Sequence, residues 1–397
     1  MGLVHKTPIF AVIGFLGILG ILGALSVTSG CGDDAPVLTD SSTRDSGSSD
    51  SGPADTGAVD SGSTDSGPSD TGAADSGPAT CDPTASGIVF PSREWNAEVV
   101  AAGALVDEPV GVAFDGRGAL LFSNSSSWIG AGVDPGDVLE VNGGTLGAFA
   151  ADDLMVGPGH VAFLGAAAGG FDPGLYLATE DGSAAGATDT VLEISPDGMT
   201  VAALTAAVTD PGEVEFGGGG DFGDDLYVTT RERDDSTAPN ARVLVRVASD
   251  GTATPFDVMD GSTVITGAWS LEFGPGGALG TDLFLGTIDD PGFSPGSIDG
   301  IYRVRASDGE ATLFANGIRP RAIAAPAPAS PLAEAFGEHL YVVTANTILR
   351  INAARSVETF ATGIMSTAGM RFGPDGALYI AQPGAGRVIR VSPCPAM

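Results

Sequence analysis

Eight polar residues stand at two recurring places in an internal repeat, the starts of first strands and the ends of second strands, and their types suit a metal or ligand site. Seven carry carboxylate or amide oxygens and one is a histidine: Glu108, Asn124, His160, Glu180, Glu213, Glu232, Asp289 and Asn346. Such oxygens are the donors that Ca²⁺ prefers, and His160 suits a general base or a ligand. The structural alternative is that the acids cap blades or pair with Arg231, Arg233 and Arg321, and that His160 is a hydrogen-bonding group in a channel.

The repeat that carries these residues begins with an apolar-x-apolar triplet. The triplets end at Phe114, Phe163, Phe216, Phe273, Ala325 and Phe372, which are 49, 53, 57, 52 and 47 residues apart. Each triplet is followed by a turn and a second apolar segment, such as Leu226-Tyr-Val228. A period near fifty with about four strands per unit predicts a β-propeller, because one small sheet cannot bury both of its faces alone.

The sixth unit is incomplete, and this predicts how the ring closes. Its third strand, Arg387–Val391, is followed by only six residues, with proline at 393 and 395, so no fourth strand fits. An unassigned strand, Asn96–Ala102, precedes the first unit. Placed on the outer edge of the sixth blade, it removes the free edges of an open array. We therefore expect an all-β, six-bladed β-propeller over residues 82–397, closed by an N-terminal strand and with negligible helix.

Propeller topology gathers the candidate residues on one face. The innermost strand of each blade starts, and the second strand ends, on the face often called the top. Four connections after second strands are also long: 125–136, 182–189, 233–241 and 291–299. Function concentrates where loops are elaborated over a rigid scaffold, so we expect the site there. Glu215, Glu272 and Arg371 lie within first strands, where ion pairing between blades is expected.

Two of the three cysteines flank the predicted ring. Cys81 precedes the closing strand and Cys394 follows the last strand, so ring closure brings both to the sixth blade. In an oxidising compartment they are expected to form a disulfide; two free thiols are the alternative.

Residues 1–31 are a targeting segment and not part of the fold. An almost wholly apolar run from Pro8 to Val27 leads to Thr28-Ser29-Gly30-Cys31. This resembles a bacterial lipoprotein signal peptide, in which Cys31 is lipidated and becomes the mature N-terminus. An uncleaved membrane anchor is the alternative. Because Gly32 and not Asp follows the cysteine, we expect an outer-membrane lipoprotein of the cell envelope, periplasmic or surface-exposed.

Residues 32–81 are predicted to be a disordered linker. From Asp40 to Ala79 the chain consists of eight pentads that each begin with Asp. A segment dominated by Asp, Ser, Thr, Gly, Pro and Ala has little to bury, so it is expected to be an extended spacer between the membrane and the propeller. A calcium-binding repeat is the alternative, but such repeats need larger aliphatic residues.

The predicted propeller is acidic by itself. Residues 82–397 hold 40 acids and 15 Arg, because ten of the 50 acids, together with Lys6 and Arg44, lie upstream. Their formal charge is −25, out of −33 for the chain. Such a domain repels phosphate backbones, which argues against nucleic acid as a partner. Lys6 is the only lysine, so lysine-based covalent catalysis is excluded in the propeller.

Three segments resemble a known superfamily. PVGVAFDGRGALLFSN (109–124), SLEFGPGGALGTDLFLG (270–286) and GMRFGPDGALYIAQPGAGRVIRVSP (369–393) are similar to NHL-type repeats. They also resemble the wider six-bladed group of gluconolactonases, Ca²⁺-dependent phosphotriesterases and strictosidine-synthase-like proteins. The resemblance implies the propeller fold over about residues 95–393. Lactonases of this group hold a metal with a Glu, two Asn and an Asp; the same types occur here in Glu108, Asn124, Asn346 and Asp289, but they do not align with that motif.

Two functions of different classes are compatible with these features. The first is a cell-surface lipoprotein whose propeller binds a small molecule, glycan or protein partner on its top face. The second is a hydrolase of lactones or related esters at the same face, with Ca²⁺ as cofactor and His160 as the base. Converging side-chain oxygens in the channel favour the enzyme, and an apolar or Arg-paired channel mouth favours the binding protein.

Overall fold

The computed structural model describes residues 86–92, 94–125, 135–180, 189–230, 244–289 and 297–395. The chain divides into two compact units, Met1–Gly72 and Ala73–Met397, and every described residue belongs to the second. The predicted leader with Cys31, the linker, Cys81 and the site candidate Glu232 lie outside the described residues. Within the described ranges, no helix is both long and apolar enough to cross a bilayer.

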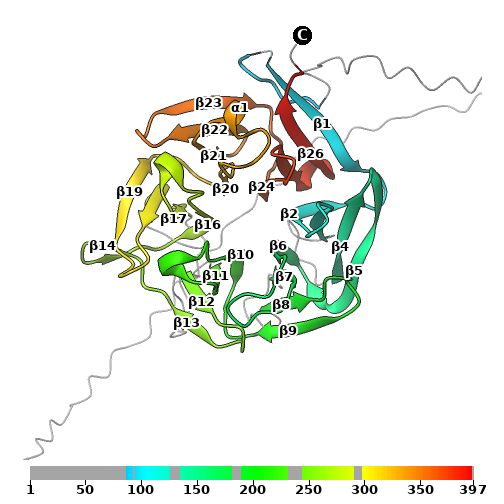
Figure 1. The fold of residues 1–397 in the computed structure, drawn as a ribbon, viewed down its shortest axis with the longest axis horizontal. Helices are drawn as coiled ribbons and strands as arrows, with labels where there is room; N and C mark the ends of the chain where they lie inside the picture. The colour runs from blue at the N-terminus through cyan, green and yellow to red at the C-terminus, as the bar shows by residue number, and fades with distance from the viewer. Residues whose placement is uncertain are drawn as a thin grey trace, which may run out of the picture. The chain divides into compact units, whose positions relative to one another are not determined.

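Six four-stranded antiparallel sheets are arranged in a ring around a central axis, which confirms the predicted six-bladed β-propeller (Figure 1). The region around this axis, bounded by the innermost strands, is called the channel. Blades one to three contain β2 (Glu108–Phe114), β3 (Leu120–Ser125), β4 (Pro135–Asn142), β5 (Thr145–Val156); β6 (Pro158–Leu164), β7 (Gly174–Thr179), β8 (Thr190–Ile194), β9 (Val201–Thr205); and β10 (Pro211–Phe216), β11 (Leu226–Thr230), β12 (Leu244–Val247), β13 (Ala253–Pro255). In each, the first strand lies innermost and the others follow outward in chain order.

The second half of the ring repeats this order. Blades four to six contain β16 (Ala268–Phe273), β17 (Leu283–Thr287), β18 (Gly300–Val304), β19 (Ala311–Asn316); β20 (Ala322–Ala324), β21 (His339–Val343), β22 (Thr347–Asn352), β23 (Val357–Thr362); and β24 (Met370–Phe372), β25 (Leu378–Gln382), β26 (Arg387–Pro393), β1 (Trp95–Ala102). A small hairpin joins blades three and four: β14 (Met259–Asp260) and β15 (Thr263–Val264). Helix in the described residues is limited to α1 (Ala333–Phe336) and three single 3₁₀ turns.

The N-terminal strand closes the ring as predicted. β1 pairs antiparallel with β26, in a register that runs from Trp95 opposite Pro393 to Ala102 opposite Arg387. The amide of Cys394 donates a hydrogen bond of 2.7 Å to the carbonyl of Glu94, so the chain ends of the ring meet in the sixth blade. Pairing of Cys394 with Cys81 stays a prediction.

The hydrophobic core lies between the blades. Each of six clusters of buried side chains combines residues from two neighbouring blades. For example, Ala162 and Tyr176 of blade two pack with Val214 and Val228 of blade three. Strand side chains alternate between the two faces of a sheet, and both faces of every blade meet a neighbour. The near-continuous apolar runs of the first and second strands follow from this.

Tyrosines of the second strands fix the turns at the bottom face, which lies opposite the top. The hydroxyls of Tyr176, Tyr227 and Tyr341 donate to the carbonyls of Asp172, Phe222 and Phe336, at 2.8, 2.9 and 2.7 Å. A buried tyrosine normally finds such a partner for its hydroxyl. The tyrosine of the Leu-Tyr-Val-like pattern therefore has two roles: its aromatic ring packs in the core, and its hydroxyl holds a turn at the bottom face.

Candidate functional site

An ion pair crosses the central channel. Arg371 on β24 donates from both terminal nitrogens to the Glu215 carboxylate on β10; the Nη1–Oε1 distance is 3.2 Å, and Nη2 donates to Oε2. β10 belongs to blade three and β24 to blade six, on opposite sides of the ring (Figure 1). Both residues directly precede a repeat phenylalanine, so the predicted pairing between blades is found, and it joins the two halves of the ring.

Glu213 lies beside this pair and is 5% exposed. Its Oε2 accepts a hydrogen bond of 2.9 Å from the Leu271 amide on β16, which is the innermost strand of the next blade. Its Oε1 lies 3.7 Å from Nδ1 of His160, which is 8% exposed. Glu213 thus supplies the acceptor that an inner-edge amide lacks within its own sheet.

Burial controls protonation in this cluster. Burial raises the pKa of Glu213 to about 8, although the Leu271 amide and the Arg371 charge act in the opposite direction. Burial and the charges of neighbouring glutamates also raise the pKa of Glu272 well above its usual value. Burial acts to lower the pKa of Arg371, but Glu215 outweighs it and the pKa is raised. At neutral pH the cluster therefore consists of one ion pair and two carboxylic acids that favour the neutral form.

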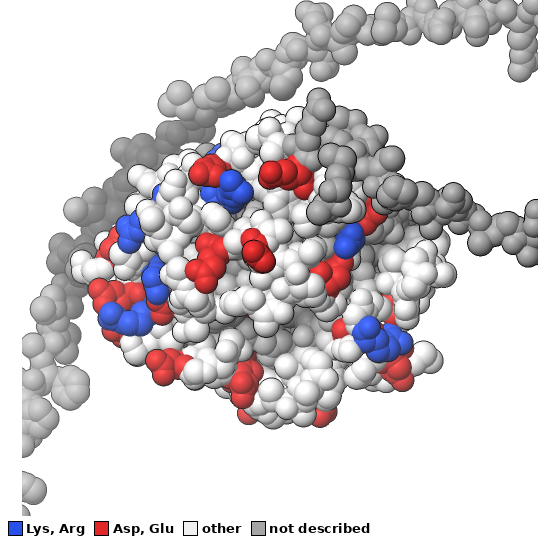
Figure 2. All heavy atoms as spheres, turned by 45° about the horizontal axis from the view of Figure 1, so that its top comes forward, with Lys and Arg blue, Asp and Glu red and all other residues white. Residues whose placement is uncertain are grey.

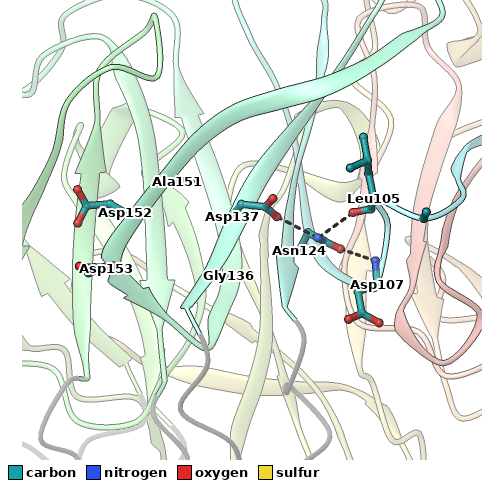
Figure 3. Close-up of a pocket in the computed structure, with 9 residues that line it drawn as sticks. Leu105, Asp107, Asn124, Gly136, Asp137, Ala151, Asp152 and Asp153 are labelled. Atoms are coloured by element: carbon teal, nitrogen blue, oxygen red, sulfur yellow. Dashed lines mark hydrogen bonds between the residues drawn. The ribbon is translucent and has the colours of Figure 1, made fainter.

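A second acidic group lines a pocket of about 520 Å³ on the top face of blade one (Figure 3). Asn124 on β3 organises it. Its Oδ1 accepts from the Asp107 amide at 2.8 Å, and its Nδ2 donates to the Leu105 carbonyl at 3.1 Å and to Asp137 Oδ1 at 2.9 Å. Asp152 and Asp153 of β5 complete the acidic lining. The amide thereby fixes the loop after β1 to β3 and β4, the two middle strands of blade one.

The electrostatics of this pocket differ from those of the channel. Asp107, Asp152 and Asp153 are exposed, and none of the described lining residues is basic. Partial burial raises the pKa of Asp137, against a lowering by its hydrogen bond from Asn124. The pocket thus presents up to four negative charges to solvent, which suits a positively charged ligand.

The predicted ring residues occupy different surroundings. Asn124 belongs to the pocket of blade one, and His160 and Glu213 belong to the channel cluster. Glu180 follows β7, and its amide bonds to the Gly157 carbonyl at 3.1 Å. Glu108 begins β2 and is half-buried, whereas Asp289 and Asn346 are exposed after β17 and β21. All of these described residues lie at the top ends of their strands, but the structure brings them into more than one group.

Sequence reasoning missed the other acids of the pocket. Asp137 stands near the start of a third strand, and Asp152 and Asp153 stand near the end of a fourth. In an antiparallel blade these positions share the top face with the start of the first strand and the end of the second. Counting acids at all four strand ends would have found them.

The described residues contain no cluster of three or more His, Cys and acidic side chains of the kind that holds a metal ion. Asp137 Oδ1 and the Asn124 amide are already hydrogen bonded to each other, and Asn346 and Asp289 lie in other blades. The donor types that the lactonase resemblance pointed to are present at the top ends of strands in blades one, four and five.

Comparisons with known proteins show the fold. No protein-family model matches the sequence, and no curated protein matches it. A putative oxidoreductase (glucose dehydrogenase) from Thermus thermophilus is 19% identical with a TM-score of 0.53, covering 75% of this chain and 100% of that one. A gluconolactonase from Xanthomonas campestris is 13% identical with a TM-score of 0.52, covering 75% and 90%. The soluble aldose sugar dehydrogenase of Escherichia coli is 16% identical with a TM-score of 0.50, covering 75% and 99%.

These likenesses confirm the predicted resemblance to the six-bladed propellers that include gluconolactonases. At identities below 20% they establish the architecture and leave the activity open, since one fold carries many functions. The function has to be argued from the site.

Proposed function

We propose that this protein is a lipid-anchored protein of the bacterial cell envelope whose propeller binds a small organic cation on its top face. The acidic pocket of blade one carries the proposal. Three of its four aspartates, Asp107, Asp152 and Asp153, are exposed, and its described lining holds no basic residue. The channel carboxylates, in contrast, contact Arg371 and inner-strand amides.

The ligand class follows from charge and shape. A pocket of about 520 Å³ admits a small molecule, and its aspartates attract an amine or guanidinium group and repel anions. Figure 2 shows that charged side chains on the face it presents form small separate groups, several of mixed sign, within an otherwise uncharged surface. Among the described residues visible in that view, there is no broad patch of a single sign.

The test is a binding panel on the full-length protein. Calorimetry with amines, amino sugars, neutral sugars and sugar acids should show saturable binding of the cationic members only. Asp152→Asn with Asp153→Asn should weaken that binding at least about tenfold. Asp221→Asn with Glu334→Gln is the matched control, because it removes two exposed acids outside the pocket. Equal loss in both double variants, or tight binding of sugar acids, would contradict the proposal.

The alternative function is a calcium-assisted hydrolase of a lactone or ester at the top face. His160 favours it, because a histidine beside a carboxylate near a channel mouth is suited to act as a base. If Ca²⁺ binds, it raises the melting temperature by mass action. A Ca²⁺-dependent shift after chelation and re-addition, together with turnover of a lactone panel that His160→Ala abolishes, would replace the binding proposal.

Two further features of the envelope proposal are testable by chemistry. Cys31→Ser should prevent lipidation and release the protein from the membrane fraction; unchanged retention with an intact leader would favour an uncleaved anchor.

A peptide map without reduction should link the Cys81 and Cys394 peptides, because the ring is proposed to close in an oxidising compartment. Alkylation of both as free thiols would rule the disulfide out.

A further inference from the structure

We propose that Asn142 is a modification site, at which the side-chain amide is lost by spontaneous deamidation. Asn142 ends β4 and pairs with Thr145 at the start of β5, so Gly143 and Gly144 form the turn of this hairpin. All four residues are exposed. The turn lies at the bottom end of blade one, away from the top-face pocket, so the inference does not depend on the proposed ligand.

The reaction is an intramolecular displacement at the Asn142 side chain. The backbone nitrogen of Gly143 attacks Cγ; the new N–Cγ bond closes a five-membered succinimide, and the Cγ–Nδ2 bond breaks. The nitrogen leaves as ammonia, which takes up, through solvent, the proton that the Gly143 amide loses. Water then opens the ring at either carbonyl to give aspartate or isoaspartate. One water is consumed, one ammonia is released, and nothing is oxidised or reduced.

The turn leaves the attacking nitrogen free. Gly143 and Gly144 have φ values of 56° and 80°, as in a type I′ hairpin turn. Among the described residues, none accepts a hydrogen bond from the Gly143 amide. Beyond the chain neighbours, no atom lies within 4 Å of the place that a Cβ would take on either glycine. A glycine also brings no Cβ of its own to obstruct the attack, so the succinimide has room and water reaches it.

A second Asn-Gly pair in the chain provides an internal comparison. Asn316 ends β19 and is exposed, and Gly317 follows it with a φ of 71°. The Gly317 amide, however, donates a hydrogen bond of 2.8 Å to the Asp299 carbonyl. This bond has to open before the nitrogen can attack, just as it has to open before the amide hydrogen exchanges. Asn142 should therefore react faster than Asn316, although both precede a glycine.

The test follows both sites by peptide mass spectrometry while the full-length protein is kept at mildly alkaline pH, which deprotonates more of the attacking amide. Conversion at Asn142 should be at least about fivefold faster than at Asn316, the effect of one hydrogen bond. Enzymatic methylation of isoaspartate should label the Asn142 peptide. In concentrated urea the two sites should react at similar rates, because the fold then no longer protects Asn316.

Gly143→Ala and Gly144→Ala are matched variants for this experiment. Each adds one methyl group at an exposed, left-handed position of the same turn, but only Gly143→Ala places it on the attacking residue. Gly143→Ala should slow conversion of Asn142 at least about tenfold, and Gly144→Ala should leave it within about twofold. Equal slowing in both variants would overturn the proposal. So would equal rates at Asn142 and Asn316 in the folded protein, or an Asn142 that stays intact while the protein in urea is converted.

Discussion

The two acidic clusters of the propeller use the same side-chain chemistry in opposite ways. In the channel, Glu213 and Glu215 contact an inner-strand amide and Arg371, and they join blades to one another. In the pocket of blade one, Asp152 and Asp153 are exposed on an outer strand, and no described lining residue neutralises them. The contacts of a carboxylate, and not its presence on a particular face, indicate whether it is available to a ligand.

Arg371→Met is the change with the largest expected effect on the channel cluster. It leaves Glu215 and Glu272 without their cation, and breaking a largely buried pair from one side costs about 3–5 kcal/mol. Because Arg371 and Glu215 retain 27% and 18% side-chain exposure, we expect the low end of that range. The free energy of unfolding from urea titration should fall accordingly.

Arg371→Met combined with Glu215→Met provides the control for this experiment. The double variant removes both charges and should recover much of the lost stability, because no unpaired charge from this pair remains. If the single variant is as stable as the wild type, the ion pair does not join the halves of the ring, and the contrast between the two clusters fails.

Glu213→Gln should raise the free energy of unfolding, in contrast to Arg371→Met, and the size of the increase should depend on pH. The pKa of Glu213 is raised from 4.5 to about 8, so folding takes up a proton between these values. The contribution of this group to the free energy of unfolding therefore falls as pH rises from 4.5 to 8, by about 1.4 kcal/mol per pH unit, and is constant above pH 8. Glutamine mimics the neutral acid, so the variant should gain stability over the wild type at pH 8.

The measurement is urea unfolding of both proteins at several pH values between 4.5 and 9. The difference between them should be small at the acid end and reach a few kcal/mol at pH 8. Asp152→Asn, an exposed acid-to-amide change outside the channel, is the matched control. A constant difference at every pH would show that Glu213 is already charged in the folded protein.

Asn124→Ala should have an intermediate effect on the free energy of unfolding. Asn124 hydrogen bonds the loop that lines the pocket to the strands of blade one. The variant removes three hydrogen bonds, to Asp107, Leu105 and Asp137. Because water can reach the partners at the pocket, the expected loss is about 2 kcal/mol and not the sum for fully buried groups. Hydrogen exchange should speed up in the loop after β1. Faster exchange in blade four instead would contradict a local role.

The fold could be predicted because the same residue types recur at the same positions in successive repeats. A phenylalanine ends most first strands, and a tyrosine or phenylalanine lies in most second strands. The missing fourth strand of the sixth unit left one place for Asn96–Ala102, which β1 occupies. These features depend on local pattern and ring topology, both of which a sequence contains.

The candidate site could be predicted only in part. From their positions in the predicted strands, Asn124, His160 and Glu213 were expected on the top face, and the structure places them at the top ends of their strands. Sequence position does not say which partner a side chain reaches. Glu213 reaches a neighbouring blade's amide and Asn124 reaches the loop after β1, so two residues predicted to lie on the same face became part of different clusters. Such pairings depend on the packing of adjacent blades.

The smallest effect on stability is expected where the effect on binding is largest. Asp152→Asn with Asp153→Asn changes exposed side chains, so the free energy of unfolding should move by no more than about 0.5 kcal/mol. At low ionic strength the variant should be slightly the more stable of the two, because two like charges leave an acidic domain; salt at about 1 M should erase that difference by screening. Urea titrations at both salt concentrations measure it. A loss of stability comparable to that of Arg371→Met would mean that these aspartates hold the blade together, and the pocket would then belong with the channel as part of the scaffold.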